Sequence, residues 1–377
     1  MPDRHQPDAL ERPPYLNDPA FWDSPENWSG EPFPHATDLR GHVFFRTSGS
    51  TGVPKWIALS KTALLTSAAA VNRHLEVTED SIWGLALPIH HVGGFGVVAR
   101  AFEAGCHLAT FTPRWDPAAF AQWLEKSRVT HTSLVPTQVH DLVKAHLRAP
   151  STLRAIVVGG GKMDTPIGQA ARNLGWPVLA SYGMTEAGSQ IATQPLATLA
   201  SPYTPAPIPV LPIWHTRLEA DGRLAISGPA LFTGTFTDGL FHPRPGDWHV
   251  TSDRVLLENR AISPIGRADH FVKVLGELID PEEIVRKILH LAGGTLSPEH
   301  FTIVPLPDAR VGNLLVPVFE NRISLQEIEI FLARYHASAP GLLRLAKPVI
   351  LDTFPRSPLG KPRRAELIDL VRDKFVD

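Results

Sequence analysis

The stretch THTSLVPTQVHDLVKAHLRAPSTLRAIVVGGG, residues 130–161, decides the fold class. Its first part, 130–136, is short and rich in β-branched residues, which predicts a strand, and apolar residues in 136–147 recur at helical spacing. Residues 153–161 are again apolar and end in three glycines, which predicts a second, buried strand. A strand, a helix and a strand in immediate succession are typical of parallel strands joined by a helical crossover.

The same alternation continues on both sides of this stretch. We expect further strands at 42–47, 81–88, 107–111 and 177–183, and further helices at 60–75, 93–105, 116–128 and 164–175. The pattern predicts an α/β fold with a doubly wound, mostly parallel sheet, whose ligand crevice lies at the carboxyl ends of the strands.

Changes in pattern divide the chain into three parts. Residues 1–40 are rich in proline and lack periodicity, so we expect an N-terminal arm. Residues 41–266 form the expected core domain, in which 210–262 lose helical periodicity and predict a small antiparallel β unit. A second pattern of strands and helices predicts a small α+β domain over 267–377.

The composition is that of an ordinary globular protein, with 43% hydrophobic residues and a formal net charge of −2 over 377 residues. Such a balance gives no reason to expect nucleic acid or an anionic membrane as a partner. The single cysteine, Cys106, excludes an intramolecular disulfide. The first residues lack the apolar stretch of a signal peptide, and charged and histidine residues interrupt the most apolar segment, so we expect no membrane span and a cytoplasmic location.

The segment FFRTSGSTGVPKW, residues 44–56, contains the hydroxyl and glycine residues that let backbone N–H groups surround phosphate oxygens. It is not a Walker A loop, because Gly49 and Gly52 are only three residues apart and Trp56 follows Lys55. Taken alone, the segment could equally be a polar turn.

Other polar motifs follow predicted strands. In YGMTEAG, Tyr182 is suited to stacking on a base, while Thr185 and Glu186 are suited to Mg²⁺. The glycines of VVGGGKMD let a flat ring lie against the backbone. Further along the chain, the Asp253 carboxylate could accept hydrogen bonds from both hydroxyls of a ribose. Arg267 and Lys361 add two positive charges. Each of these features alone has a plainer explanation, such as a tight turn or a surface charge, but their order in one chain favours a nucleotide site.

This ordered set resembles the adenylate-forming superfamily of acyl-CoA synthetases, adenylation domains and luciferases, over roughly residues 42–370. The resemblance implies an acid–thiol ligase that uses ATP, Mg²⁺ and CoA. It implies that Lys361 stabilises the adenylation transition state together with Thr185 and Glu186, that Glu186 holds the metal, and that Asp269 is the hinge of a mobile C-terminal domain. It implies a CoA-facing surface at Lys273 and Gly276. The implied nucleotide contacts are Thr47, Ser48, Gly49, Ser50, Thr51, Gly52, Lys55, Gly159, Gly160, Gly161, Ser181, Tyr182, Gly183, Met184, Thr185, Asp253 and Arg267.

The expected acyl pocket is formed by LPIHHVGGFGVVARAF, residues 87–102, and HTSLVPTQ, residues 131–138. Both segments are similar to those of the o-succinylbenzoate–CoA ligases of menaquinone biosynthesis. Arg100 either faces solvent or binds the second carboxylate of such a substrate, because an unpaired buried carboxylate is costly. Further donors and the shape of the pocket would come from Ser133, Thr137 and His91.

The chain also departs from the resembled pattern. The phosphate loop begins at residue 47, where the family has a longer N-terminal subdomain, and His270 stands where many relatives have aspartate. That subdomain is therefore either missing or replaced by the proline-rich arm, and a homodimer could cover the face that its absence exposes. An aryl- or acyl-CoA ligase of other specificity, an enzyme that loads a carrier protein, and a non-catalytic nucleotide-binding protein stay open as alternatives.

Overall fold

The computed structural model describes residues 16–33, 37–48, 54–268, 271–275, 277–308, 310–339, 341–356 and 362–375. The chain divides into two compact units. The first comprises the residues up to Thr251 together with Val255–Ile265, and the second comprises Ser252–Arg254 together with the residues from Gly266 onward. Within the described ranges, no helix is long and apolar enough to cross a membrane.

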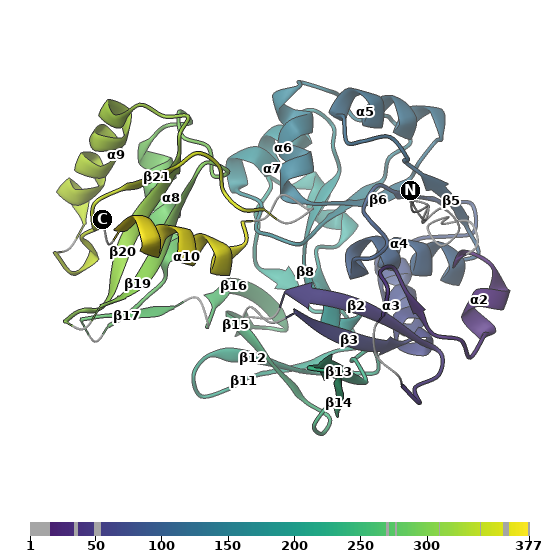
Figure 1. Ribbon diagram of the computed structural model, residues 1–377. Helices are drawn as coiled ribbons and strands as arrows, with labels where there is room; N and C mark the ends of the chain where they lie inside the picture. The colour runs from purple at the N-terminus through teal and green to yellow at the C-terminus, as the bar shows by residue number, and fades with distance from the viewer. Residues whose placement is uncertain are drawn as a thin grey trace, which may run out of the picture. The chain divides into compact units, whose positions relative to one another are not determined.

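A six-stranded sheet forms the centre of the first unit (Figure 1). Its order is β5-β4-β6-β7-β8-β9, in which the first five strands are parallel and β9 runs antiparallel to β8. The doubly wound, mostly parallel sheet predicted from the sequence is thus confirmed. The chain order reverses between β4 and β6, and this switch point is where open α/β sheets bind ligands. The strands are β4 (Ile82–Leu85), β5 (His107–Thr110), β6 (His131–Leu134), β7 (Ala155–Val158), β8 (Val178–Met184) and β9 (Ser189–Thr193).

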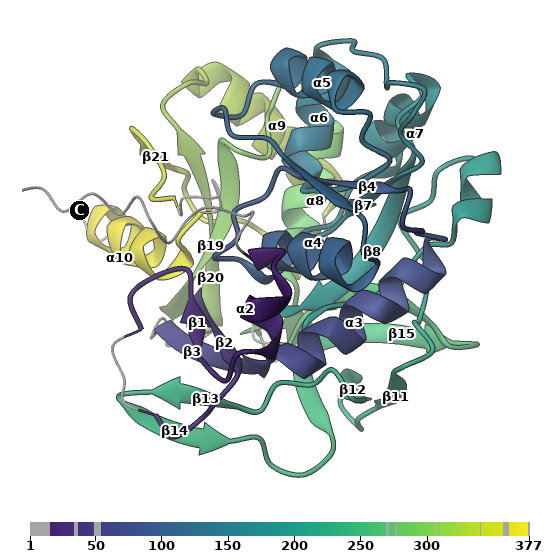
Figure 2. The ribbon, with the colours of Figure 1, turned by 90° about the vertical axis from the view of Figure 1, so that its right-hand side faces the viewer.

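Helices cover both faces of this sheet. On one face α3 (Lys61–His74) and α4 (Val92–Glu103) lie side by side (Figure 2). The other face carries α5 (Pro117–Lys126), α6 (Pro136–Lys144) and α7 (Thr165–Asn173). Two of these helices begin at side-chain caps. At α3 the Ser60 hydroxyl accepts a hydrogen bond of 3.1 Å from the backbone N–H of Ala63, and at α5 Asp116 accepts one from the N–H of Ala119.

A second sheet has the order β1-β2-β3-β13-β14. Its hairpin β2–β3 pairs Thr47 with Lys55, so these two residues flank the glycine-rich segment. The single antiparallel unit expected over 210–262 is therefore wrong in part, because β13 pairs with β3, where Phe236 packs with Trp56. The strands are β1 (Trp28–Ser29), β2 (His42–Ser48), β3 (Pro54–Ser60), β13 (Gly234–Thr237) and β14 (Leu240–Pro243).

The rest of the 210–262 region forms a third sheet, of order β10-β16-β15-β12-β11. Its strands are β10 (Ile208–Pro209), β11 (His215–Leu218), β12 (Arg223–Ser227), β15 (His249–Glu258) and β16 (Ala261–Arg267), and short 3₁₀ turns stand at Thr185–Ala187 (η1) and Leu196–Ala200 (η2).

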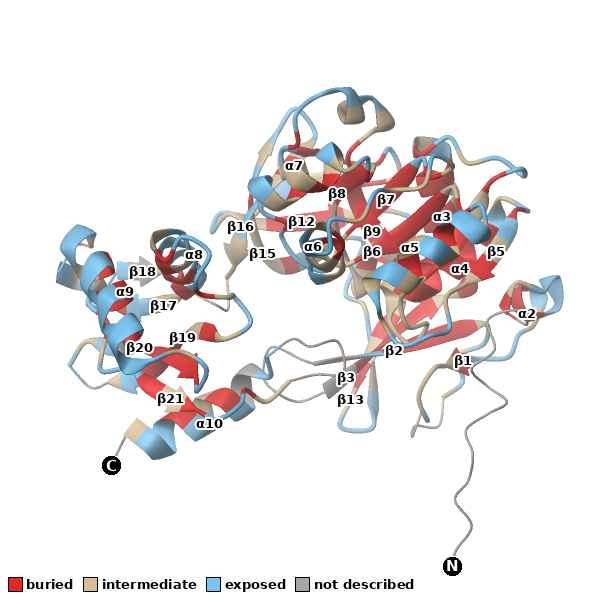
Figure 3. Ribbon diagram, turned by 90° about the horizontal axis from the view of Figure 1, so that it is seen from above, coloured by how far each residue is buried: buried red, intermediate tan, exposed pale blue. Residues whose placement is uncertain are grey.

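The described part of the N-terminal segment contributes to the core of the first unit. The short helix α2 (Pro19–Asp23) buries Phe21 and Trp22, and β1 buries Trp28. The ring of Trp28 lies 5.0 Å from that of Phe95 in α4, centroid to centroid. Buried residues run through the central strands and reach these aromatic side chains (Figure 3).

In the second unit, the sheet β19-β20-β21 has a different core on each face. Phe301 and Phe319 pack with α8 and α9, whereas Val304 and Val318 pack with α10, as strand alternation requires. The predicted α+β fold of this part is confirmed. Its elements are β17 (Val272–Val274), β18 (Glu277–Ile279), α8 (Pro281–Leu291), β19 (Phe301–Asp308), β20 (Gly312–Glu320), α9 (Leu325–Ser338), η3 (Gly341–Leu343), β21 (Val349–Leu351) and α10 (Arg364–Phe375).

Two helical glycines in the first unit provide a test of its packing. A Cβ atom at Gly168 in α7 would overlap the ring of Tyr203, which is 1% exposed, whereas one at Gly93 in α4 would meet nothing closer than Leu87 Cδ1 at 3.6 Å. We expect Gly168→Ala to lower the free energy of unfolding by about 1–3 kcal/mol. The matched variant Gly93→Ala should leave it unchanged or raise it by up to about 1 kcal/mol.

Urea unfolding followed by tryptophan fluorescence measures this difference in the first unit alone, since all nine tryptophans lie between Trp22 and Trp248. Equal stability of the two variants would contradict the docking of Tyr203 on α7.

Candidate active site

The candidate site lies where the parallel strands of the first unit end. His91 caps the start of α4 after β4, Thr137 lies in the first turn of α6 after β6, and Gly159–Gly161 follow β7. Thr185 and Glu186 follow β8 in η1. Since β4, β6, β7 and β8 are parallel, these residues gather at one edge of the sheet.

An ion pair joins the glycine-rich hairpin to this edge. The Lys55 ammonium lies 2.9 Å from Glu186 Oε1, and the two side chains are 34% and 16% exposed. Lys55 is the second residue of the return strand β3, and its carbonyl accepts a hydrogen bond of 3.4 Å from the Thr47 hydroxyl. Lys55, at the base of the glycine-rich segment, is thus held by Glu186, the residue that the sequence predicts as a metal ligand.

The charges around Glu186 keep its carboxylate ionised. Burial by itself raises the pKa of this carboxyl, but the adjacent Lys55 ammonium outweighs burial and holds the pKa below its ordinary value. The imidazole of His249 interacts electrostatically with Glu186. Burial lowers the pKa of this imidazole, although the negative charge of Glu186 acts to raise it. A neutral imidazole and a paired carboxylate therefore stand together at neutral pH.

The turn between β8 and β9 requires unusual backbone positions. The strand register shifts between Tyr182 and Gly183, and a Cβ atom at Gly183 would overlap the carbonyl oxygen of Ser189. Ser189 itself has φ of 114°, which a residue with a side chain rarely adopts. Such strain is typical of functional sites, and here it directs the Ser189 hydroxyl toward Arg100.

Arg100 does not face solvent, since its exposed fraction is 2%. Its guanidinium donates to the Ser133 hydroxyl at 3.1 Å through Nη1 and to the Ser189 hydroxyl at 3.2 Å through Nη2. The glycine at position 96 leaves room for it, because a Cβ there would lie 3.0 Å from Nη2. The first of the two interpretations of Arg100, a solvent-facing residue, is therefore wrong.

No carboxylate of the described residues forms an ion pair with Arg100, whose side-chain hydrogen bonds both go to neutral hydroxyls. Burial lowers the pKa of the guanidinium to about 9, which still leaves it charged at neutral pH. A buried cation without an anionic partner is costly. The arrangement is suited to receiving an anion from a ligand.

The remaining predicted site residues fall into three groups. In the first unit, Tyr182 and His91 are half-buried, Thr137 is exposed, and the Ser181 hydroxyl donates to the Val158 carbonyl at 3.0 Å beside Gly159. The second unit holds the half-buried Asp253 and Arg267 and the exposed Lys273. Outside the described residues lie Gly49, Ser50, Thr51, Gly52, Asp269, His270, Gly276 and Lys361, and Ser48 is described by its backbone alone.

Three residues of the site were not predicted from the sequence. Ser189 carried no signal beyond its place near YGMTEAG, and His249 is one histidine among 17. Asn72 of α3 donates to the Arg100 carbonyl at 2.8 Å and accepts from Trp83 Nε1 at 3.2 Å, so it fixes α4 from behind. Their roles depend on contacts between segments far apart in the chain, which local patterns do not reveal.

Among the described residues no group of three or more His, Cys, Asp or Glu side chains could hold a metal ion by itself. Glu186, with the neighbouring Thr185 hydroxyl, can supply one or two oxygen ligands. Mg²⁺ is commonly bound in this way, with substrate phosphates and water completing its shell. The residues present therefore fit a metal that arrives with a nucleotide.

Known proteins resemble this chain in sequence and in fold. The 2-succinylbenzoate–CoA ligases of Escherichia coli and Salmonella typhimurium are 31% and 32% identical to it, over 73% and 82% of this chain and 57% and 64% of their own lengths. The solved structure of o-succinylbenzoate coenzyme A synthetase from Bacillus subtilis, in complex with ATP and magnesium ion, superposes with a TM-score of 0.72 at 24% identity. That match covers 86% of this chain and 69% of the other, and it supports the fold.

The chain thus spans between about half and two thirds of the length of these two relatives. A family model described as AMP-binding enzyme matches residues 12–234, which include the Lys55–Glu186 pair and Arg100. The chain belongs to the family of AMP-binding enzymes.

Proposed function

We propose that the chain is an ATP-dependent acid–CoA ligase whose acid is o-succinylbenzoate, an intermediate of menaquinone biosynthesis. ATP adenylates the succinyl carboxylate with release of pyrophosphate, and CoA then displaces AMP to give the thioester. The named relatives, 2-succinylbenzoate–CoA ligases, support this reaction.

The observation that carries the choice of acid is the buried guanidinium of Arg100. o-Succinylbenzoate has two carboxylates, of which one reacts and the other has to be bound in place. Arg100, with Ser133 beside it, offers charge-assisted hydrogen bonds to the aromatic carboxylate. A simple fatty acid or benzoate would leave this cation unpaired, as it is without ligand, so such acids lack the favourable ion pair that o-succinylbenzoate gains on binding.

In the nucleotide site, Lys55 binds phosphate and Glu186 binds the metal ion. Lys55, at the base of the phosphate-loop segment, exchanges its contact with Glu186 for the β- and γ-phosphate oxygens. Glu186 and Thr185 then hold Mg²⁺, which supplies neutralisation of phosphate charge when bound. Tyr182 stacks on the adenine, and the glycines at 159–161 let the ring approach the backbone.

The second unit supplies the remaining groups. The Asp253 carboxylate accepts hydrogen bonds from the ribose hydroxyls, and Arg267 contacts the ribose and the phosphate. Lys361 approaches both the attacking carboxylate and the α-phosphate and offsets the repulsion of the two anions. Rotation at Asp269 then withdraws Lys361 and brings the surface with Lys273 and Gly276 toward the thiol of CoA, so that one site serves two half-reactions.

The purified chain with o-succinylbenzoate, ATP, Mg²⁺ and CoA should give o-succinylbenzoyl-CoA, AMP and pyrophosphate in equal amounts, as measured by mass spectrometry and pyrophosphate release. Without CoA, pyrophosphate release should stop after about one equivalent of bound adenylate. Turnover of benzoate or a fatty acid, with none of o-succinylbenzoate, would favour a ligase of other specificity. Adenylate that reacts with a carrier protein but not with CoA would favour a carrier-loading enzyme, and no pyrophosphate with any acid would favour a non-catalytic protein.

Replacing Arg100 separates a binding role from a structural one. Arg100→Met removes the charge but keeps an unbranched side chain. The KM for o-succinylbenzoate should rise about 10- to 100-fold, because the loss of a hydrogen bond to a charged group weakens binding by about this factor. The KM for ATP should stay within about twofold. Because an uncompensated buried charge is removed, the melting temperature without substrate should stay the same or increase.

The matched control is Arg172→Met, which removes a guanidinium that donates to the carbonyls of Thr198, Ser201 and Val178. This variant should lower the melting temperature and leave the KM for the acid unchanged. If folded Arg100→Met retains the acid KM of the original chain, the proposed carboxylate site is wrong.

A further inference from the structure

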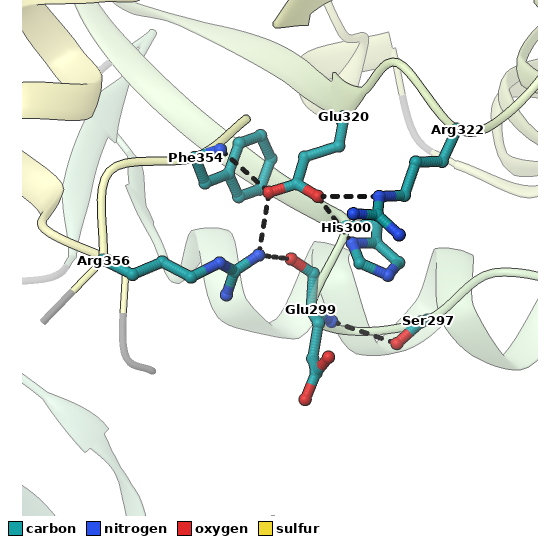
Figure 4. Close-up of polar contacts among 7 residues, drawn as sticks. All are labelled: Ser297, Glu299, His300, Glu320, Arg322, Phe354 and Arg356. Carbon is teal, nitrogen blue, oxygen red and sulfur yellow. Dashed lines mark hydrogen bonds and ion pairs between the residues drawn. The ribbon is translucent and has the colours of Figure 1, made fainter. Parts of the chain in front are cut away.

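The second unit contains a buried carboxylate with an unusual number of partners, that of Glu320 at the end of β20. Its side chain is 4% exposed, and Figure 4 shows it between partners from three other segments. Oε1 accepts from the backbone N–H of Phe354 at 2.8 Å and from Arg356 Nη2 at 2.9 Å. Oε2 pairs with His300 Nδ1 at 2.7 Å and lies 3.7 Å from Arg322 Nε.

These contacts overcome the cost of burying the acid. Burial by itself raises the pKa of the Glu320 carboxyl, but the hydrogen bonds from Phe354, Arg356 and His300 outweigh burial and hold it below its ordinary value. A fully hydrogen-bonded buried carboxylate specifies one geometry for the groups around it, whereas a hydrophobic side chain of similar size would not.

The partners of Oε1 belong to the segment that leads to Lys361. The chain leaves β21 at Leu351, Phe354 is buried, and Arg356 forms an isolated antiparallel bridge with Pro362. The backbone N–H of Arg363 donates to the Pro355 carbonyl at 2.8 Å, and α10 begins at the next residue. The Arg356 guanidinium also donates to the Glu299 carbonyl.

The described residues on either side of 357–361 are therefore bonded to one another and to the body of the second unit. On one side Glu320 holds Phe354 and Arg356, and on the other Pro362 and Arg363 are bonded back to the same short segment. Lys361 directly precedes Pro362 in the sequence and lies outside the described residues.

We propose that Glu320 is a positioning residue for the adenylation step: through Arg356 and Phe354 it fixes the base of the segment that presents Lys361. The inference rests on the proposed function, in which Lys361 acts at the α-phosphate. It goes beyond that function because Glu320 is given no contact with substrate or nucleotide there and acts through Arg356 and Phe354.

Half-reactions distinguish this role from general stabilisation of the unit. Adenylation is measured by pyrophosphate release or by ATP–pyrophosphate exchange, and thioester formation by supplying synthetic o-succinylbenzoyl-AMP with CoA. Glu320→Gln keeps the size of the side chain but removes its charge, so adenylation should fall about 10-fold or more. Thioester formation, for which Lys361 has been withdrawn, should stay within about twofold.

The control variant is Arg322→Gln, which removes the most distant and most exposed cation from the same carboxylate. Both half-reactions should keep their rates in this variant. A milder change, Arg356→Lys, retains the charge but shortens the reach, and it should reproduce the selective loss of adenylation if Glu320→Gln is too unstable to assay.

A double variant provides the most stringent comparison. Lys361→Ala should lower adenylation to a small residual rate at normal ATP binding, and Glu320→Gln in that background should not lower the residual rate further, because its effect passes through Lys361. Equal losses in both half-reactions, or losses that multiply in the double variant, would overturn the proposal while leaving the ligase function intact. If the original chain performs neither half-reaction, the proposed function itself fails.

Discussion

The guanidinium of Arg100, buried and held by two serine hydroxyls, is the constraint around which much of the first unit is arranged. A Cβ atom at position 96 would lie only 3.0 Å from its Nη2, the guanidinium bonds to Ser189, whose φ is 114°, and it lies over the ring of Trp83 at 5.3 Å. A charge in such surroundings costs free energy until an anion pairs with it. The apolar core must offset that cost in the absence of ligand, and a ligand carboxylate is the natural means of removing it.

The two units divide the chemistry that such a ligand undergoes. The first unit contains the buried cation that we propose selects the acid, and it contains the Lys55–Glu186 ion pair, whose charges are already matched. In the proposed reaction, phosphate oxygens would pair with Lys55 and a bound Mg²⁺ would pair with Glu186, so neither charge would be left unpaired. In the second unit, Glu320 binds Phe354 and Arg356, which precede Lys361 in the sequence.

The sequence predicted the fold class because hydrophobic periodicity changes visibly between strand and helix along residues 42–183. It did not predict that β13 pairs with β3, since the choice of strand partner depends on Phe236 meeting Trp56, a contact between distant segments. Motifs drew attention to Lys55 and Glu186 but not to their ion pair. Arg100 stayed ambiguous because α4 is apolar on nearly all sides, so periodicity could not indicate a solvent face. Glu320 carried no local signal at all.

The most direct test of the account compares two acids with the original chain, o-succinylbenzoate and 4-oxo-4-phenylbutanoate, which differ only in the aromatic carboxylate. Pyrophosphate release gives kcat/KM for each acid under identical conditions. If the buried cation of Arg100 selects the acid, kcat/KM should be at least about 100-fold higher for o-succinylbenzoate than for the other acid. Binding sites discriminate strongly against an analogue that lacks the group paired with their buried polar residue. Equal values for the two acids would contradict the account.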